Sequence, residues 1–152
     1  MKFSLSKLKT AFGNQNSKDK TNLDNFIEEI TKTIEQKPFA SSDQNVCYLA
    51  TNELAGYYFL QTIIVGKFKI KTFNGAQLTV KGEGFKLELE SDMKELVSDL
   101  YAVPKSYVTR IDFIMNKKDV PKIDKSKIHS LLLTAKKQNI EFSILQTTDE
   151  EE

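Results

Sequence analysis

Apolar and polar residues alternate with a period of two through the middle of the chain. Between residues 67 and 90 the inward-facing positions form one set, and most of the residues between them are charged or polar. The inward set is Phe68, Ile70, Thr72, Leu78, Val80, Phe85, Leu87 and Leu89. This alternation is typical of strands with one buried face and one solvated face. With Asn74-Gly75 as a tight turn and Gly82-Glu83-Gly84 as a second turn, it predicts an antiparallel meander.

Three further segments have the character of strands. Residues 57–65 are almost continuously apolar, which favours a central position in the sheet, and Gly66 is expected to form a bulge after them. Residues 106–115 and 140–145 also read as strands.

Helical spacing occurs in two longer segments. Residues 22–37 carry an apolar stripe that ends before Pro38, and residues from Asp124 or Ser126 to Asn139 carry a second one. The stripes are Leu23, Phe26, Ile27, Ile30 and Ile34 in the first, and Ile128, Leu131, Leu132 and Ala135 in the second. A shorter helix over residues 92–100, capped by Asp92, is also predicted.

The N-terminal residues form a separate amphipathic segment. Met1, Leu5, Leu8 and Phe12 recur at helical spacing, and the polar residues 13–20 read as a flexible linker. We therefore divide the chain into an appendage at 1–20, a single domain at 21–146 and a disordered acidic tail at 147–152.

These elements predict an α+β fold. We expect an antiparallel β-meander sheet of about five or six strands with two main helices packed on one face, plus the short N-terminal amphipathic helix. The final strand–helix–strand unit, residues 106–145, is expected to place its two strands in parallel through a right-handed crossover.

Composition narrows the function only slightly. The 152 residues carry 22 basic and 21 acidic side chains, for a net charge of +1, and Arg110 is the sole arginine. This balance and the lack of arginine argue against specific nucleic-acid binding. No secretory signal or transmembrane segment is visible, so we expect a soluble, cytoplasmic protein.

The sequence gives no convincing catalytic or metal-binding set. Cys47 and His129 are the only residues of their types, and a buried thiol and a solvated imidazole are the interpretations we favour. We predict no catalytic residue, no metal ion and no cofactor. The lysines at 67, 69, 71, 81 and 86 could contact phosphates or anionic lipid. We favour the alternative that they pair with acids such as Glu88 and Glu90 across the sheet.

One polar pair is a candidate site. Arg110 and Asp112 lie two residues apart on one predicted strand and therefore point to the same side. We favour a simple ion pair there, and we name the pair as the first place to look for a binding site.

Three hypotheses for function follow. The first is a non-catalytic protein-interaction module, such as an adaptor, assembly component or inhibitor-like binder, that docks a partner through Met1, Leu5, Leu8 and Phe12. Contact of residues 1–12 with a membrane surface is an alternative that we do not favour. The simpler interpretation of this segment, which we weigh above docking, is that it packs back on its own domain or is frayed. The second is a carrier with an apolar pocket lined by Tyr57, Tyr58, Phe59, Phe68 and Phe85. The third, which we favour least, is an enzyme that uses carboxylates such as Asp43, Glu53 or Asp112.

Overall fold

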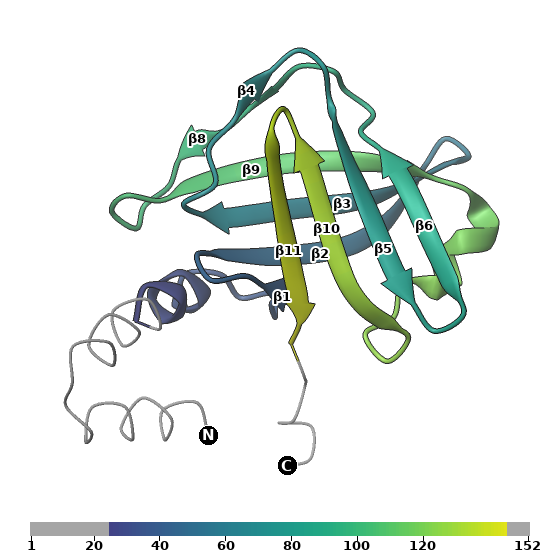
Figure 1. Ribbon diagram of the computed structural model, residues 1–152, viewed down its shortest axis with the longest axis horizontal. Coiled ribbons are helices and arrows are strands. Elements are labelled where there is room, and N and C mark those ends of the chain that lie inside the picture. The colour runs from purple at the N-terminus through teal and green to yellow at the C-terminus, as the bar shows by residue number, and fades with distance from the viewer. Residues whose placement is uncertain (1–24, 146–152) are drawn as a thin grey trace.

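The protein is predominantly β in residues 25–145, which are the residues that the computed structural model describes (Figure 1). Residues 25–32 form a helix, and a 3₁₀ helix, η1, spans Lys117–Lys122. The strands are β1 (Ala40–Ser41), β2 (Asn45–Leu54), β3 (Tyr57–Gly66), β4 (Lys71–Thr72), β5 (Ala76–Gly82), β6 (Phe85–Glu90), β7 (Leu96–Val97), β8 (Asp99–Leu100), β9 (Tyr107–Met115), β10 (Ile128–Ala135) and β11 (Gln138–Ile144).

Nine of these strands form one antiparallel sheet that curls into two layers. The order is β6-β5-β10-β11-β1-β2-β3-β9-β8, while β4 and β7 form a separate two-stranded ribbon. In Figure 1 a front layer of β11, β10, β5 and β6 crosses a back layer of β2, β3 and β9 at a steep angle. The corner is the short strand β1, because Ala40 pairs with Ile144 of β11 on one side and with Cys47 of β2 on the other. This is the orthogonal way of packing two sheets.

The main core lies between the two layers. The front layer contributes Leu78, Val80, Leu131, Leu133 and Phe142 among others, and the back layer contributes Leu60, Ile64, Ile111 and Phe113. At the end where β9 leads into β10, Val120 and Ile123 pack against this core. The side chains that alternate along the strands therefore fill the space between the layers.

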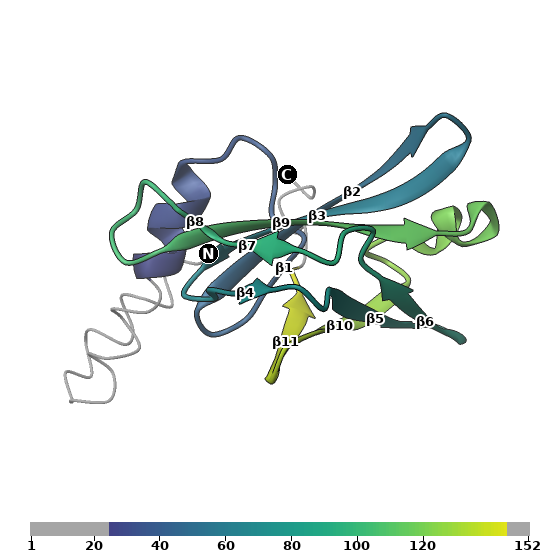
Figure 2. The same ribbon diagram turned by 90° about the horizontal axis from the view of Figure 1, so that it is seen from above.

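A second core lies on the opposite face of the back layer, under the helix (Figure 2). The period of two along β2 divides its residues between the cores: Cys47 and Leu49 face the front layer, whereas Val46 and Tyr48 face Ile30 of the helix. The back layer is thus buried on both faces at the helix end, which explains why its strands read as continuously apolar.

The predicted α+β class is wrong, and the main sheet has nine strands in place of the five or six that were expected. The second layer is the other half of the curled sheet, and the predicted pair of helices does not cover it. The first helix is described only over residues 25–32 and does not extend to residue 37, because the chain turns at Thr33, whose hydroxyl donates to the carbonyl of Ile30.

The predicted helices at 92–100 and 124–139 are wrong as well. The first region forms β7 and β8, and the second forms β10 and the turn to β11. The expected parallel crossover within residues 106–145 does not occur, because β9 pairs with β3 and β8 while β10 pairs antiparallel with β5 and β11.

Several strand predictions are confirmed. Strand β3 lies centrally between β2 and β9, and β9 and β11 match the segments predicted at 106–115 and 140–145. The turn at Gly82-Glu83-Gly84 joins β5 to β6. Asn74-Gly75 does not close a hairpin: β4 pairs with β7, and the chain then moves on to the main sheet at β5. Gly66 ends β3 without a shift of register, so the expected bulge is absent from this strand.

The N-terminal segment 1–20 and the acidic tail 147–152 lie outside the described residues. No helix in the described part of the chain has the length and apolar character that crossing a bilayer requires.

Candidate functional site

Part of the outer face of the back layer is left open beyond the helix. Along β2, β3 and β9 this region carries the apolar residues Leu54, Tyr57, Phe59 and Ile114. We call these four residues, together with Arg110 and Asp112, the arm face. Leu54, Tyr57 and Ile114 are 66%, 68% and 48% exposed, and Phe59 is partly exposed. The helix and Val103 cover the same face only at its other end, over Val46, Tyr48 and Val65.

Strand pairing places these apolar side chains next to one another. Leu54 is paired with Tyr57 across the β2–β3 hairpin, and Phe59 is paired with Ile114 across β3 and β9. Directly paired residues of an antiparallel sheet have their Cβ atoms about 4.5–5.5 Å apart, so their side chains form a continuous strip.

A tight turn extends the strip beyond the body of the protein. Ala55 and Gly56 both have positive φ angles, 54° and 84°, as two-residue hairpin turns of this hand require. Figure 2 shows the tip of the β2–β3 hairpin projecting away from the front layer. The hairpin therefore presents Leu54 and Tyr57 to solvent.

The candidate polar pair lies on this face. Arg110 and Asp112 are exposed residues of β9, paired with Ile63 and Gln61 of β3, and they share their side of the strand with Ile114. The salt bridges found among the described residues do not join them. The two opposite charges thus border the apolar strip and remain available to a ligand.

The other predicted docking residues, Met1, Leu5, Leu8 and Phe12, lie outside the described residues. The structure therefore does not place them with respect to the arm face.

Cys47 and His129 are not brought together. Cys47 is 1% exposed in the main core, and its burial raises the pKa of the thiol from 9.0 to about 12, which keeps it protonated and unreactive. His129 is exposed on β10, where its Nε2 lies 3.0 Å from Oε1 of Glu83 in the β5–β6 turn. An exposed pair of this kind, open to water, is typical of a surface contact.

The candidate carboxylates are likewise separate. Glu53 is paired with Tyr58, whose side chain packs on the main core, so Glu53 lies on the opposite face of the sheet from Asp112. Asp43 lies at the other end of β2, in an open polar pocket of about 710 Å³. That pocket is lined by residues 41–45 and by Asn139, Ile140, Glu141 and Ser143. Within residues 25–145 no three His, Cys, Asp or Glu side chains cluster as metal ligands would.

The five aromatic residues proposed to line an apolar pocket lie on two faces. Phe68, Tyr58 and Phe85 pack on the main core, whereas Tyr57 and Phe59 lie on the arm face. Two of the predicted lysines, Lys69 and Lys71, lie against the turn between β10 and β11, whereas Nζ of Lys67 lies over the Phe26 ring of the helix. Lys81 and Lys86 face each other across β5 and β6. Lys86 makes a 3.5 Å ion pair with Glu88 on its own strand, which is the one acid pairing of this set that the described contacts show.

Sequence reasoning missed the apolar part of the arm face. The available signal was Leu54-Ala-Gly-Tyr57, a turn sequence between two apolar residues that would have indicated a hairpin between β2 and β3. Its period of two would also have placed Tyr57 and Phe59 on the face opposite to Leu60.

Comparison of the chain with protein-family models, with curated proteins and with solved structures finds no match. Its function is therefore inferred from the geometry alone.

Proposed function

We propose that the chain is a non-catalytic protein-interaction module that binds its partner through the arm face. The observation that carries this proposal is the uncovered part of the outer face of the back layer, which carries a continuous apolar strip. Contiguous exposed apolar surface bordered by polar residues is characteristic of protein interfaces.

The residue types of the arm face suit an interface. Tyr57 and Phe59 are aromatic and Arg110 is the only arginine of the chain. Aromatic residues and arginine are enriched in interfaces and dominate their energetics. Each large apolar side chain that leaves water for a partner contributes about 1.5–3 kcal/mol before the costs of association.

The same residues define the chemistry of the partner. It needs an apolar surface that covers Phe59 and Ile114, with an acidic group near Arg110 and a basic group near Asp112. Complementary charges at the rim of an interface orient a partner more than they tighten its binding.

A capture experiment with matched variants tests the proposal. Ile114→Lys and Tyr57→Asp place charges in the strip, and Glu90→Lys changes an exposed strand residue in the front layer. The tagged wild type and Glu90→Lys should capture the same protein from the native cell, whereas the two arm variants should lose it while keeping the melting temperature of the wild type. With the purified partner, slowed amide hydrogen exchange is expected in residues 52–61 and 110–115.

Other outcomes overturn the proposal. Capture that survives both arm variants would place the interface elsewhere. If light scattering shows that the pure wild type is a dimer and Ile114→Lys makes it a monomer, the surface binds a second copy and not a different protein.

A further inference from the structure

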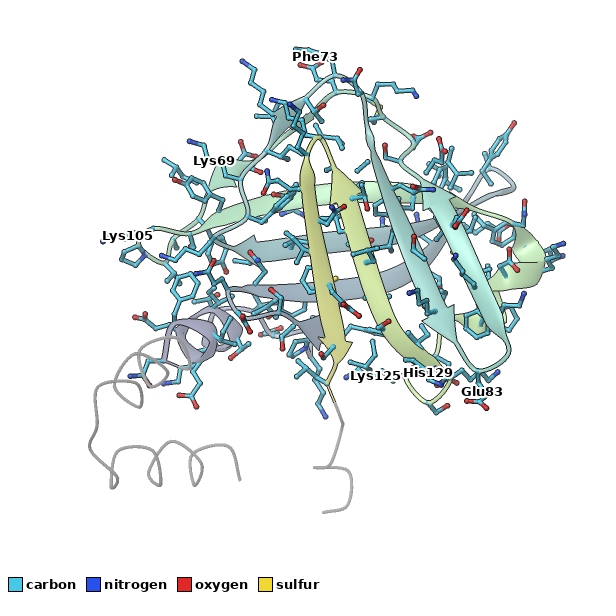
Figure 3. The ribbon with its side chains drawn as sticks, in the orientation of Figure 1. Lys69, Phe73, Glu83, Lys105, Lys125 and His129 are labelled. Atoms are coloured by element: carbon cyan, nitrogen blue, oxygen red, sulfur yellow. The ribbon has the colours of Figure 1, made fainter. Side chains whose placement is uncertain are left out.

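A second group of exposed apolar residues lies at another end of the molecule, on the β4–β7 ribbon and next to it. Phe73, Met93, Val97 and Leu100 are 63%, 61%, 47% and 79% exposed. Val97 of β7 is paired with Lys71 of β4, and the N–H of Gly75 donates to the carbonyl of Lys94 at 2.8 Å, so the loops that carry Phe73 and Met93 are held together. Figure 3 shows Phe73 at the outer end of its loop.

Lysines lie beside this group. The turn between β10 and β11 is fixed against residues 69–71, because Nζ of Lys136 donates to the carbonyl of Lys71 at 3.0 Å and Nε2 of Gln138 donates to that of Lys69 at 3.2 Å. Nζ of Lys69 lies 5.1 Å from the centre of the Tyr107 ring. The lysines of this end are Lys69, Lys71, Lys94, Lys136 and Lys137, and the acids on the same segments are Asp92, Glu95 and Asp99. Lys67 is not one of them, because its Nζ lies 4.6 Å from the centre of the Phe26 ring in the helix.

The net charge of this end is positive. The salt bridges found within the described residues include none of these five lysines. Five positive charges against three negative ones leave an excess of two cations beside apolar side chains that project outward.

Projecting apolar side chains with lysines beside them match the boundary of an anionic membrane. The apolar side chains enter the region between headgroups and acyl chains, while lysines contact the headgroup phosphates. A single nucleic-acid strand is a poorer match, because Met93, Val97 and Leu100 have no ring on which a base can stack and Arg110 lies on the arm face.

We propose that this end of the molecule, defined by Phe73, Met93, Val97 and Leu100 with the lysines beside them, docks on an anionic lipid surface. It is a different surface from the arm face, and the proposal does not depend on the proposed partner protein.

Vesicle flotation with the full-length protein tests the proposal. Wild type should bind vesicles of phosphatidylglycerol and phosphatidylcholine at low salt, and high salt or pure phosphatidylcholine should weaken binding about tenfold or more. Phe73→Ser and the double variant Lys136→Glu/Lys137→Glu should each weaken it by a similar factor. The control Lys81→Glu/Lys86→Glu makes the same change in charge on β5 and β6 and should bind as wild type does.

Three results would overturn the proposal. The first is absence of vesicle binding by a wild type that melts normally. The second is binding that is unchanged in Phe73→Ser and lost when residues 1–12 are deleted, which would assign the contact to the N-terminal segment. The third is binding that inorganic phosphate or a single-stranded oligonucleotide abolishes at equal ionic strength, which would assign the lysines to a free anion or to nucleic acid.

Discussion

Ser91 and Phe113 form an isolated antiparallel bridge between the end of β6 and β9. The two strands lie near opposite ends of the sheet order, so this bridge brings the curled sheet close to a closed barrel. The N–H of Asp92 donates to the carbonyl of Asp112 at 2.8 Å and supports the same contact. Closure of this kind protects the edges of the sheet from pairing with other chains.

The hydroxyl of Ser91 fixes this closure, so Ser91→Ala should destabilise the fold. Its Oγ accepts from the N–H of Ala76 at 3.0 Å and donates to the carbonyl of Met93 at 2.8 Å, and Ser91 is only 8% exposed. The loss of a buried partner costs about 1–3 kcal/mol of unfolding free energy, which urea denaturation measures. Ser143→Ala, on the exposed side of β11, should change stability by less than about 0.5 kcal/mol. Equal stabilities of the two variants would contradict this role for Ser91.

The burial of alternate residues in 67–90 could be predicted from sequence, because apolar and polar side chains alternate there with a period of two. Phe68, Ile70, Leu87 and Leu89 are buried as expected. The segment around the leucines at 131–133 could not be assigned in this way, since three consecutive apolar residues fit a helix and a strand equally well. The segment forms a strand because it pairs with residues about fifty positions away in the chain: Leu131 with Val80 and Leu133 with Leu78.

The candidate functional site, too, could be predicted only in part from local sequence. Sequence period places Arg110 and Asp112 on one side of β9, and the register confirms that they share a face. Whether that face is covered depends on where the helix of residues 25–32 packs, and the local sequence of β9 does not predict the position of the helix. The exposure of Ile114 and Phe59 is therefore a property of the tertiary structure alone.

The end of β3 tolerates no side chain at Gly66, which is paired with Asn45 at the start of β2. A Cβ there would lie 2.1 Å from the carbonyl oxygen of Gln44 and 2.7 Å from Cα of Asn45. Backbone atoms cannot rotate aside as side chains do, so Gly66→Ala should cost about 3 kcal/mol or more in the free energy of unfolding.

Gly56→Ala is the matched control for Gly66→Ala. Gly56 has a φ of 84°, but no atom lies within 4 Å of the position that a Cβ would take, so the substitution should cost only about 1 kcal/mol. Denaturation curves of both variants measure the difference, and a Gly66→Ala variant as stable as Gly56→Ala would show that the backbone around the end of β3 can relax.

Tyr48 carries a buried hydroxyl without a hydrogen-bond partner among the described residues. Its ring packs in the core beneath the helix, where the side chain is 1% exposed. Tyr48→Phe keeps the ring and removes the unpaired hydroxyl, so we expect stability at neutral pH to stay the same or rise by up to about 1 kcal/mol. A clear loss of stability would show that the hydroxyl has a partner.

The same variant should change the response to alkali. Burial, and secondarily the charge of Tyr101, raises the pKa of Tyr48 from 10.0 to about 12, so its contribution to stability holds below pH 10 and is lost as the pH rises toward 12. Burial also raises the pKa of Cys47, so an alkaline loss that begins near pH 9 should persist in Tyr48→Phe. Between pH 10 and 12 the variant should lose less stability than wild type, by up to about 1.4 kcal/mol per pH unit.

Deletion of residues 1–12 should leave the fold intact and weaken a partner complex. Within residues 25–145, the two core clusters are built from residues between Phe26 and Ile144. If these clusters hold the fold together, the melting temperature measured by calorimetry should change by less than about 2 °C. If Met1, Leu5, Leu8 and Phe12 add contacts to the partner that the arm face binds, capture should fall in the deletion variant.

A variant with serine at these four positions keeps the length of the segment and should behave in the same way, because the apolar stripe supplies the contacts. Loss of the folded state would show that the segment belongs to the core, and undiminished capture would leave the arm face as the sole docking surface.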